Sequence, residues 1–178
     1  MSKIIKIVMV GGGSYNWSPR LLCDLVQTPE LEGAEVVLLD IDLKAAKNIK
    51  AAIDRVCADN GKKFSFIATS DENKAFKDCD FVIITINTGG LETMRHDLAI
   101  PRKYGIYQTV GDSPGPGGWS RMLRNVPVFE EMTRKIEKLS PRAVVLNYSN
   151  PMAGLTGAIC QTSNLRAVGL CHGVMGTL

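Results

Sequence analysis

The sequence contains few histidines, few aromatic residues and no closely spaced cysteines. Of its 178 residues only His96 and His172 are histidines, aromatic residues make up 6%, and the five cysteines include no CxxC pair. Because the cysteines are widely spaced and nothing in the sequence directs secretion, we expect reduced thiols in a cytoplasmic protein.

Long apolar runs and one-sided charge are also missing. No stretch approaches the ~20 apolar residues that cross a bilayer, and the start, MSKIIKIVMV, runs into glycines without the cleavage site of a signal peptide. The net charge is +3, and basic residues are scattered among acidic ones rather than gathered in a stripe. We therefore expect neither a membrane nor a nucleic acid as partner.

The sequence does contain a regular alternation of apolar strand patterns and helical patterns. Strands are expected at 3–10, 35–40, 64–69, 80–86, 143–148 and 165–170, and helices at 17–28, 43–61, 119–139 and 152–162. Uninterrupted apolar strands joined by helices indicate a parallel sheet covered on both faces. The predicted fold class is therefore α/β, doubly wound and Rossmann-like, in one domain that spans residues 1–178.

The turn after the first predicted strand has the pattern of a dinucleotide site. Gly11 and Gly13, followed by Ser14, permit a tight turn and a close backbone approach to a pyrophosphate, although Asn16 stands where the third glycine usually lies. Asp40 ends the second predicted strand, where it can bind ribose hydroxyls and repel the 2′-phosphate of NADP. Glycine also serves ordinary turns, and aspartate often caps helices. Together the two features favour an NAD site.

Small and polar residues follow the other strands as well. Asn87 follows the fourth strand, Asn150 the fifth, and Cys171 with His172 the sixth. Ligands of doubly wound sheets bind beyond the carboxyl ends of the strands, so this clustering predicts an active site, with Asn87 on its cofactor side. Adjacent residues of an extended chain point to opposite sides, so at most one of Cys171 and His172 is expected to bind a metal directly.

The motifs resemble those of the NAD- and metal-dependent glycosidases of glycoside hydrolase family 4, which are related to the lactate and malate dehydrogenase fold. The resemblance covers the whole chain. It rests on VGGGSYNWSPRLL, LLDID, INTGG, IPRKYGIYQTVGD, GPGG, LNYSNPMA and GLCHGVMGT, and the last two are specific to that family.

The resemblance implies hydrolysis by a redox route instead of the usual pair of carboxylates. NAD+ would take hydride from C3 of the sugar, a base would remove the acidified C2 proton, and a divalent metal would stabilise the enolate as the glycosidic oxygen leaves. Mapped onto this sequence, Cys171 would bind the metal, usually Mn2+, and Asn150 would bind sugar hydroxyls. Gly11, Gly13, Ser14 and Asp40 would hold NAD.

Three further residues have more than one interpretation. The resemblance implies that His172, beside the metal cysteine, is typical of members acting on unphosphorylated glycosides; it would protonate the leaving group, contact a uronate, or only position the cysteine loop. Arg95 falls where phosphosugar members have an arginine, and would suit a phosphate or a carboxylate. Asp112 faces the substrate or forms a turn. The substrates favoured are α-glucuronides and α-galacturonides.

Family members are more than twice as long as this chain, so the resemblance implies that a second metal-binding histidine and a tyrosine base lie beyond Leu178. On this interpretation the 178 residues are the cofactor domain of a homodimeric or homotetrameric enzyme; alone they would bind NAD and hydrolyse nothing. Two alternatives remain at this stage: a hydroxyacid dehydrogenase with the same fold, and a non-catalytic NAD-binding module.

Overall fold

A computed structural model of the chain describes residues 4–110, 112 and 115–171. Six strands form one sheet, in the order β3-β2-β1-β4-β5-β6, and every neighbouring pair is parallel. The strands are β1 (Lys6–Val10), β2 (Glu35–Leu39), β3 (Ser65–Thr69), β4 (Phe81–Ile84), β5 (Val144–Asn147) and β6 (Arg166–Gly169). The predicted doubly wound, Rossmann-like fold class is confirmed.

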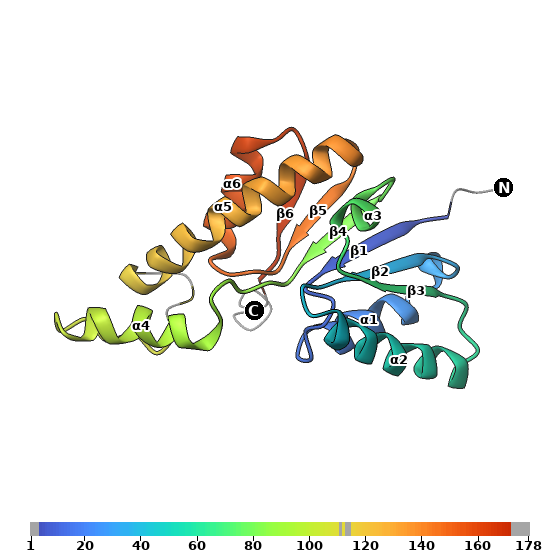
Figure 1. Cartoon of the computed structure of the whole chain (residues 1–178), viewed down its shortest axis with the longest axis horizontal. Helices are drawn as coiled ribbons and strands as arrows, with labels where there is room; N and C mark the ends of the chain where they lie inside the picture. Colours follow the sequence, from blue (N-terminus) through green and yellow to red (C-terminus); the bar gives the residue numbers. More distant parts are fainter. Residues whose placement is uncertain (1–3, 111, 113–114, 172–178) are drawn as a thin grey trace.

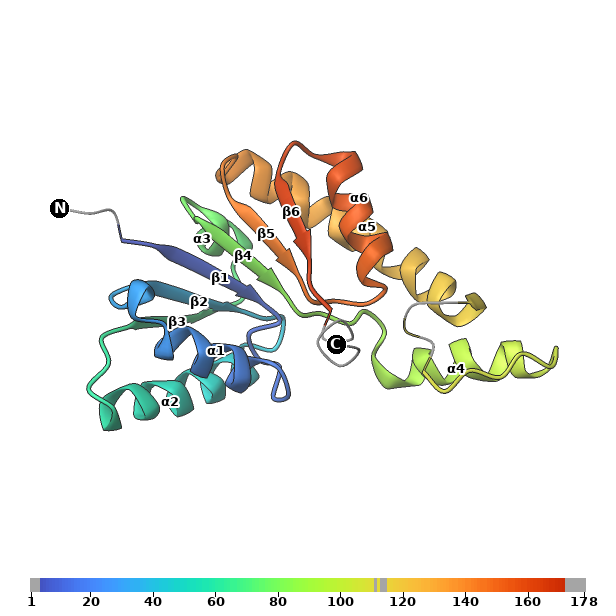
Figure 2. The same cartoon turned by 180° about the vertical axis from the view of Figure 1, so that it is seen from behind.

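Helices cover both faces of this sheet (Figure 1). α1 (Ser18–Gln27) and α2 (Leu43–Asp59) lie on one face, while α3 (Glu72–Phe76), α5 (Gly115–Leu139) and α6 (Met152–Thr162) lie on the other. Figure 2 shows the same two layers from behind. Within β1, Val8 and Val10 pack under α3, α5 and α6, whereas Ile7 and Met9 pack under α1 and α2. Burial on both faces explains why the strands are apolar without alternation.

The helix boundaries follow from local chemistry where the sequence supplies it. Pro19 stands in the first turn of α1, where a missing N–H costs nothing. The side chain of Asp42 caps α2 by accepting hydrogen bonds from the backbone N–H groups of Lys44 and Ala45, both at 3.0 Å. None of the helices among the described residues has the length and hydropathy that a membrane crossing requires.

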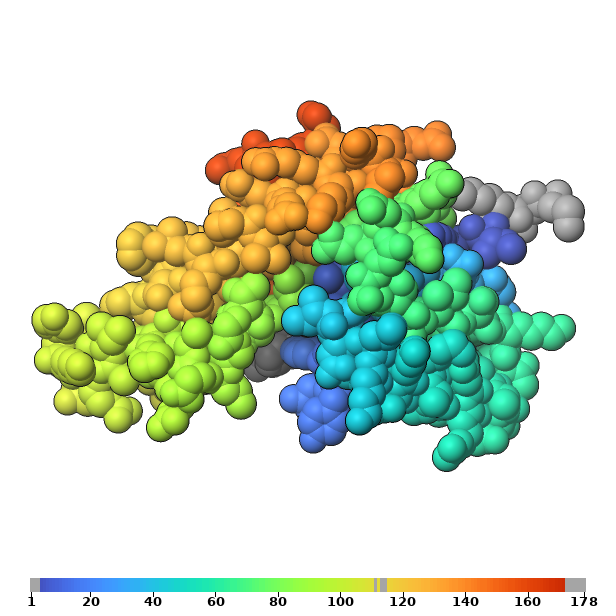
Figure 3. Space-filling model, in the orientation of Figure 1, coloured from blue at the N-terminus to red at the C-terminus, as the bar shows by residue number. Residues whose placement is uncertain are grey.

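The structure contains elements that the sequence patterns did not predict. These are α3, the 3-10 turn η1 (Pro29–Leu31) and α4 (Gly90–Arg102), and α5 begins four residues earlier than the predicted helix at 119. α4 was missed because it begins at two glycines and buries only Asp97 and Pro101, so it has no apolar stripe. α4 and the first turns of α5 form an arm that projects from the sheet, which Figure 3 shows in lime and yellow.

Candidate functional site

The turn after β1 requires glycine because the neighbouring backbone lies very close. Gly11 has φ of +84°, and the backbone N–H groups of Gly11 and Gly12 both donate to the carbonyl oxygen of Leu39, at 2.9 and 3.0 Å. A Cβ atom on Gly12 would lie 2.7 Å from the Cα atom of Leu38. These contacts fix the turn against β2 and leave its outer side open to a ligand.

Asp40, half-buried at the end of β2, holds this turn. Its Oδ2 atom accepts a hydrogen bond from the Gly13 N–H at 2.8 Å, and its Oδ1 atom accepts one from the Asp42 N–H at 2.9 Å. The helix cap is therefore Asp42, and Asp40 joins the glycine turn to the second strand. Each carboxylate oxygen can accept more than one hydrogen bond, so the predicted contact with a ribose is compatible with this structural role.

A cavity of about 680 Å3 opens above the turn, and we call it the turn cavity. This volume falls within the range of about 300–1,000 Å3 that is usual for ligand sites. Its lining includes all five residues predicted to bind the cofactor: Gly11, Gly13, Ser14, Asp40 and Asn87.

Lys135 lines the turn cavity and is held by two carboxylates. The Lys135 Nζ atom lies 2.6 Å from a carboxylate oxygen of Glu72 and 2.8 Å from one of Glu131. These hydrogen bonds raise the pKa of Lys135 above its ordinary value, and the bond from Lys135 lowers the pKa of Glu131. With Asp40 and Asp42 also present, acidic groups outnumber basic ones among the described residues of the lining, an arrangement that disfavours an additional phosphate.

A second cavity, of about 470 Å3, lies beside the turn cavity, and we call it the cysteine cavity. Asp112, Asn150 and Cys171, three of the residues predicted for substrate or metal, line it. The two cavities share four lining residues: Ser14, Thr85, Ile86 and Asn87. A ligand that extends out of the turn cavity past Asn87 would therefore enter the space in front of Asn150 and Cys171.

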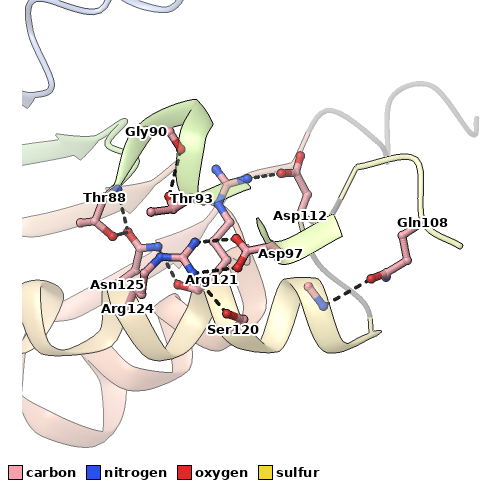
Figure 4. A network of polar contacts seen from close by, with 11 residues as sticks. Thr88, Gly90, Thr93, Asp97, Gln108, Asp112, Ser120, Arg121, Arg124 and Asn125 are labelled. Carbon is pink, nitrogen blue, oxygen red and sulfur yellow. Dashed lines mark hydrogen bonds and ion pairs between the residues drawn. The ribbon is translucent and has the colours of Figure 1, made fainter. Parts of the chain in front are cut away.

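The cysteine cavity contains a cation that sequence reasoning missed. Arg121, whose side chain is only 11% exposed, forms an ion pair with Asp112 through its Nη1 atom, as Figure 4 shows. The other Asp112 oxygen accepts a hydrogen bond from the Asn150 amide at 3.5 Å, and Asn150 Oδ1 accepts one from the Met152 N–H at 3.3 Å. This chain of contacts sets the orientation of the Asn150 carboxamide. In the sequence, the polar residues at positions 121, 124 and 125 have helical spacing, and this pattern was the available sign of a polar face on α5.

Two predicted site residues are not brought into this group. Arg95 lies on α4 with its side chain 78% exposed, pairs with Glu92 at 3.3 Å, and is absent from the lining of both cavities. His172 lies outside the described residues.

A match to a known family accompanies this geometry. The model of family 4 glycosyl hydrolases matches residues 6–178. The chain belongs to glycosyl hydrolase family 4. The predicted resemblance is confirmed.

The matched relatives include enzymes with several substrate names. An α-galacturonidase of Thermoanaerobacter italicus is 41% identical over 175 residues, which are 97% of this chain and 37% of that relative. An α-galactosidase of Rhizobium meliloti is 37% identical, with 95% of this chain and 35% of the relative covered. The chain thus spans little more than a third of the length of these relatives.

Solved structures agree on the fold. A 6-phospho-α-glucosidase from gut microorganisms, solved in complex with NAD and Mn2+, superposes with a TM-score of 0.83 at 30% identity, over 96% of this chain and 39% of that one. Malate dehydrogenase from Plasmodium falciparum superposes with a TM-score of 0.67 at 14% identity, over 96% of this chain and 46% of that one. This second likeness shows the fold alone, and it agrees with the dehydrogenase type expected for family 4.

The described residues of this family 4 chain supply only part of a metal site. Cys171 is exposed at the cavity, whereas burial raises the pKa of the Cys79 thiol, which packs in the core. No group of three or more His, Cys, Asp or Glu residues that could hold a metal occurs within residues 4–110, 112 and 115–171. A complete metal site would need further ligands.

Proposed function

We propose that this family 4 chain forms the NAD-binding part of a glycosidase that acts on unphosphorylated α-glycosides, with α-galacturonides and α-glucuronides favoured. The observation that carries the proposal is the junction of the two cavities. The glycine turn with an acidic strand end lies on one side of Asn87, and a group of polar side chains with an exposed thiol lies on the other.

On the cofactor side, the residues present fit NAD. Gly11, Gly13 and Ser14 line the cavity and would let the diphosphate approach the start of α1 closely, and Asp40 would accept hydrogen bonds from the adenosine ribose. Asn87, at the junction, lies where the nicotinamide end would pass from one cavity to the other. When bound, NAD supplies a hydride acceptor. The acidic lining supports NAD rather than NADP.

On the sugar side, Asn150 would bind ring hydroxyls through its amide, whose orientation Asp112 and Arg121 set. Asp112 is held by Arg121 and Asn150 and lines the cavity, which supports its contact with substrate rather than a turn-forming role alone. Among the described residues that line the cysteine cavity, Arg121 is the one cation, so we assign it, ahead of Arg95, to the recognition of an acidic sugar. Arg95 would reach a ligand only if the ligand extended over the surface of α4.

For the metal, Cys171 would be one ligand, and Mn2+ is the ion we favour. The described residues do not complete its coordination sphere, so other ligands would come from substrate, water or protein outside them. His172 would then act beside Cys171 by protonating the leaving group or contacting a uronate carboxylate.

Two observations support the preference for unphosphorylated α-uronides. α-Galacturonidases from four bacteria match this chain at 36–41% identity. His172 also stands directly after Cys171, in the pattern that the family resemblance associates with unphosphorylated substrates.

The activity is tested on the longest natural protein that contains these 178 residues. It is incubated with p-nitrophenyl α-glycosides and α-uronides, with and without NAD+, Mn2+ and a reductant. We expect release only when NAD+ and Mn2+ are both present, with exchange of deuterium into C2 of the sugar. Release that needs neither addition would contradict the proposal, and NAD-dependent oxidation of a hydroxyacid without metal would favour a dehydrogenase instead.

A further inference from the structure

Asn125 is a fully buried polar residue of α5. It bonds to Thr88, which lines the turn cavity, and to Arg121, which lines the cysteine cavity. Its Oδ1 atom accepts two hydrogen bonds from Thr88, from the backbone N–H at 3.3 Å and from the hydroxyl at 3.0 Å. Its Nδ2 atom donates to the carbonyl oxygen of Arg121 at 2.8 Å. Figure 4 shows the carboxamide directed at Thr88, with its own helix behind it.

The segment that Asn125 holds is the loop between β4 and α4. Asn87, Thr88 and Gly89 all line the turn cavity, and Asn87 also lines the cysteine cavity. The start of the loop is held by the segment that follows β5, because the Ile86 N–H donates to the Ser149 hydroxyl oxygen at 2.9 Å. Gly89, with φ of +83°, then turns the chain into α4. Asn125 is thus the anchor of this loop on the α5 side.

The chemistry of this anchor is specific to a carboxamide. One oxygen serves two Thr88 donors, and one N–H satisfies a carbonyl in the same helix. An apolar side chain of the same size would leave the partly buried Thr88 N–H without this partner, and burying a polar group without a hydrogen bond is costly. These two bonds therefore fix the loop to α5 beside the cavity.

We infer that Asn125 is a positioning residue for the cofactor. It fixes where the Asn87–Gly89 loop lies relative to the dinucleotide, without touching the ligand. The inference rests on the proposed NAD function. On this inference α5 contributes to cofactor binding in addition to the glycine turn and Asp40.

The test uses the 178-residue chain and isothermal titration with NAD and with AMP. AMP reports the end of the turn cavity near Asp40, whereas NAD must also pass the loop. For Asn125→Leu we expect the Kd of NAD to rise about tenfold, roughly the effect of losing one hydrogen bond, and the Kd of AMP to rise less than threefold.

The matched control is Thr133→Val. Thr133 is also buried in α5, but its hydroxyl donates to the carbonyl oxygen of Phe129 in the same helix and, within the described part of the chain, to nothing on the loop. This variant should bind NAD within about twofold of the wild type and change thermal stability little, because the Phe129 carbonyl oxygen keeps its backbone partner in the helix.

Thr88→Val completes the design and keeps it informative if Asn125→Leu fails to fold. It removes one of the two bonds from the loop side, and we expect a rise of about threefold in the Kd of NAD. Because both hydrogen bonds that Asn125 Oδ1 accepts come from Thr88, the double variant should bind NAD within about twofold of Asn125→Leu alone.

The outcomes separate the inference from the function on which it rests. Wild-type binding by Asn125→Leu, equal losses for AMP and NAD, or additive effects in the double variant would each overturn the positioning role. If the wild-type chain binds no NAD, the proposed function fails, and the inference fails with it.

Discussion

The turn cavity and the cysteine cavity are neighbours, but they are built in different ways. Much of the turn cavity comes from two consecutive strand ends, where Gly12 packs against Leu38 and Gly13 bonds to Asp40. The cysteine cavity combines Asp112, Arg121, Asn150 and Cys171, which belong to separate segments. The first site therefore depends on close backbone packing, and the second on side-chain contacts across the fold. Substitutions should affect the two in different ways.

The largest effect is expected where the turn meets β2. Gly12→Ala would place a Cβ atom 2.7 Å from the Leu38 Cα atom, which cannot move without shifting the strand. We expect a loss of about 3 kcal/mol or more in the free energy of unfolding and loss of NAD binding, measured by urea titration and calorimetry. Gly157→Ala is the control, since its Cβ would meet nothing within 4 Å in α6; it should be neutral or stabilising by up to about 1 kcal/mol.

A smaller effect is expected in the arm beside the cysteine cavity. The buried Asp97 of α4 makes a two-point ion pair with Arg124 of α5, at 2.8 and 2.5 Å. Asp97→Asn would leave the guanidinium without its anion and lower the free energy of unfolding by about 2 kcal/mol at neutral pH. NAD binding at the turn cavity should persist. Loss of NAD binding as large as that of Gly12→Ala would contradict the separation of the two sites.

The same pair gives a pH dependence. The hydrogen bonds from Arg124 hold the pKa of Asp97 below its ordinary value of 3.8. The pair therefore stabilises the fold above about pH 4, and its contribution is lost as the pH falls through the lowered pKa. Urea titrations at about pH 7 and about pH 3 should show the gap between wild type and Asp97→Asn narrowing with acid. A constant gap would show that the pair is not ionised.

A further effect concerns activity rather than folding. Arg121→Met removes the cation that holds Asp112 and, through it, the Asn150 amide. In the longest natural protein containing this chain we expect kcat/KM for an α-uronide to fall about tenfold or more, about 1.4 kcal/mol in transition-state binding, with NAD affinity unchanged. Arg134→Met is the control. Arg134 forms an exposed ion pair with Glu130 on the same helix, so its loss should change neither value. A loss confined to NAD binding would contradict the assignment.

The smallest effect is expected at the rim of the turn cavity. Lys135 bridges Glu72 and Glu131, but the group is exposed to solvent and screened by salt. Lys135→Met should change thermal stability little, and any difference should shrink as sodium chloride is raised. Affinity for NAD should change less than about twofold, because two carboxylates already neutralise the ammonium. A large loss would mean that Lys135 contacts the ligand directly.

The strands and the glycine turn could be predicted from the sequence because each is a local pattern. Val8, Val37 and Val82 belong to apolar runs that only a two-sided sheet can bury, and Gly11 with Asp40 marks the first two strand ends. α4 could not be found in this way, because its buried face consists of Asp97 and Pro101. Arg121 and Asn125 were missed because a polar residue on a helix predicts solvent unless its partner is known.

By itself, the sequence determined the layered parallel sheet, the glycine turn and the family, because apolar periodicity and short motifs act over a few residues. Only the tertiary structure decided that Arg121, not Arg95, lies beside Asp112, and that Asn125 holds Thr88. Those contacts join residues that are 9 and 37 positions apart, and they form because folding excludes water from one turn of α5. No local sequence pattern predicts which group from another segment will form a hydrogen bond or ion pair with a buried polar side chain.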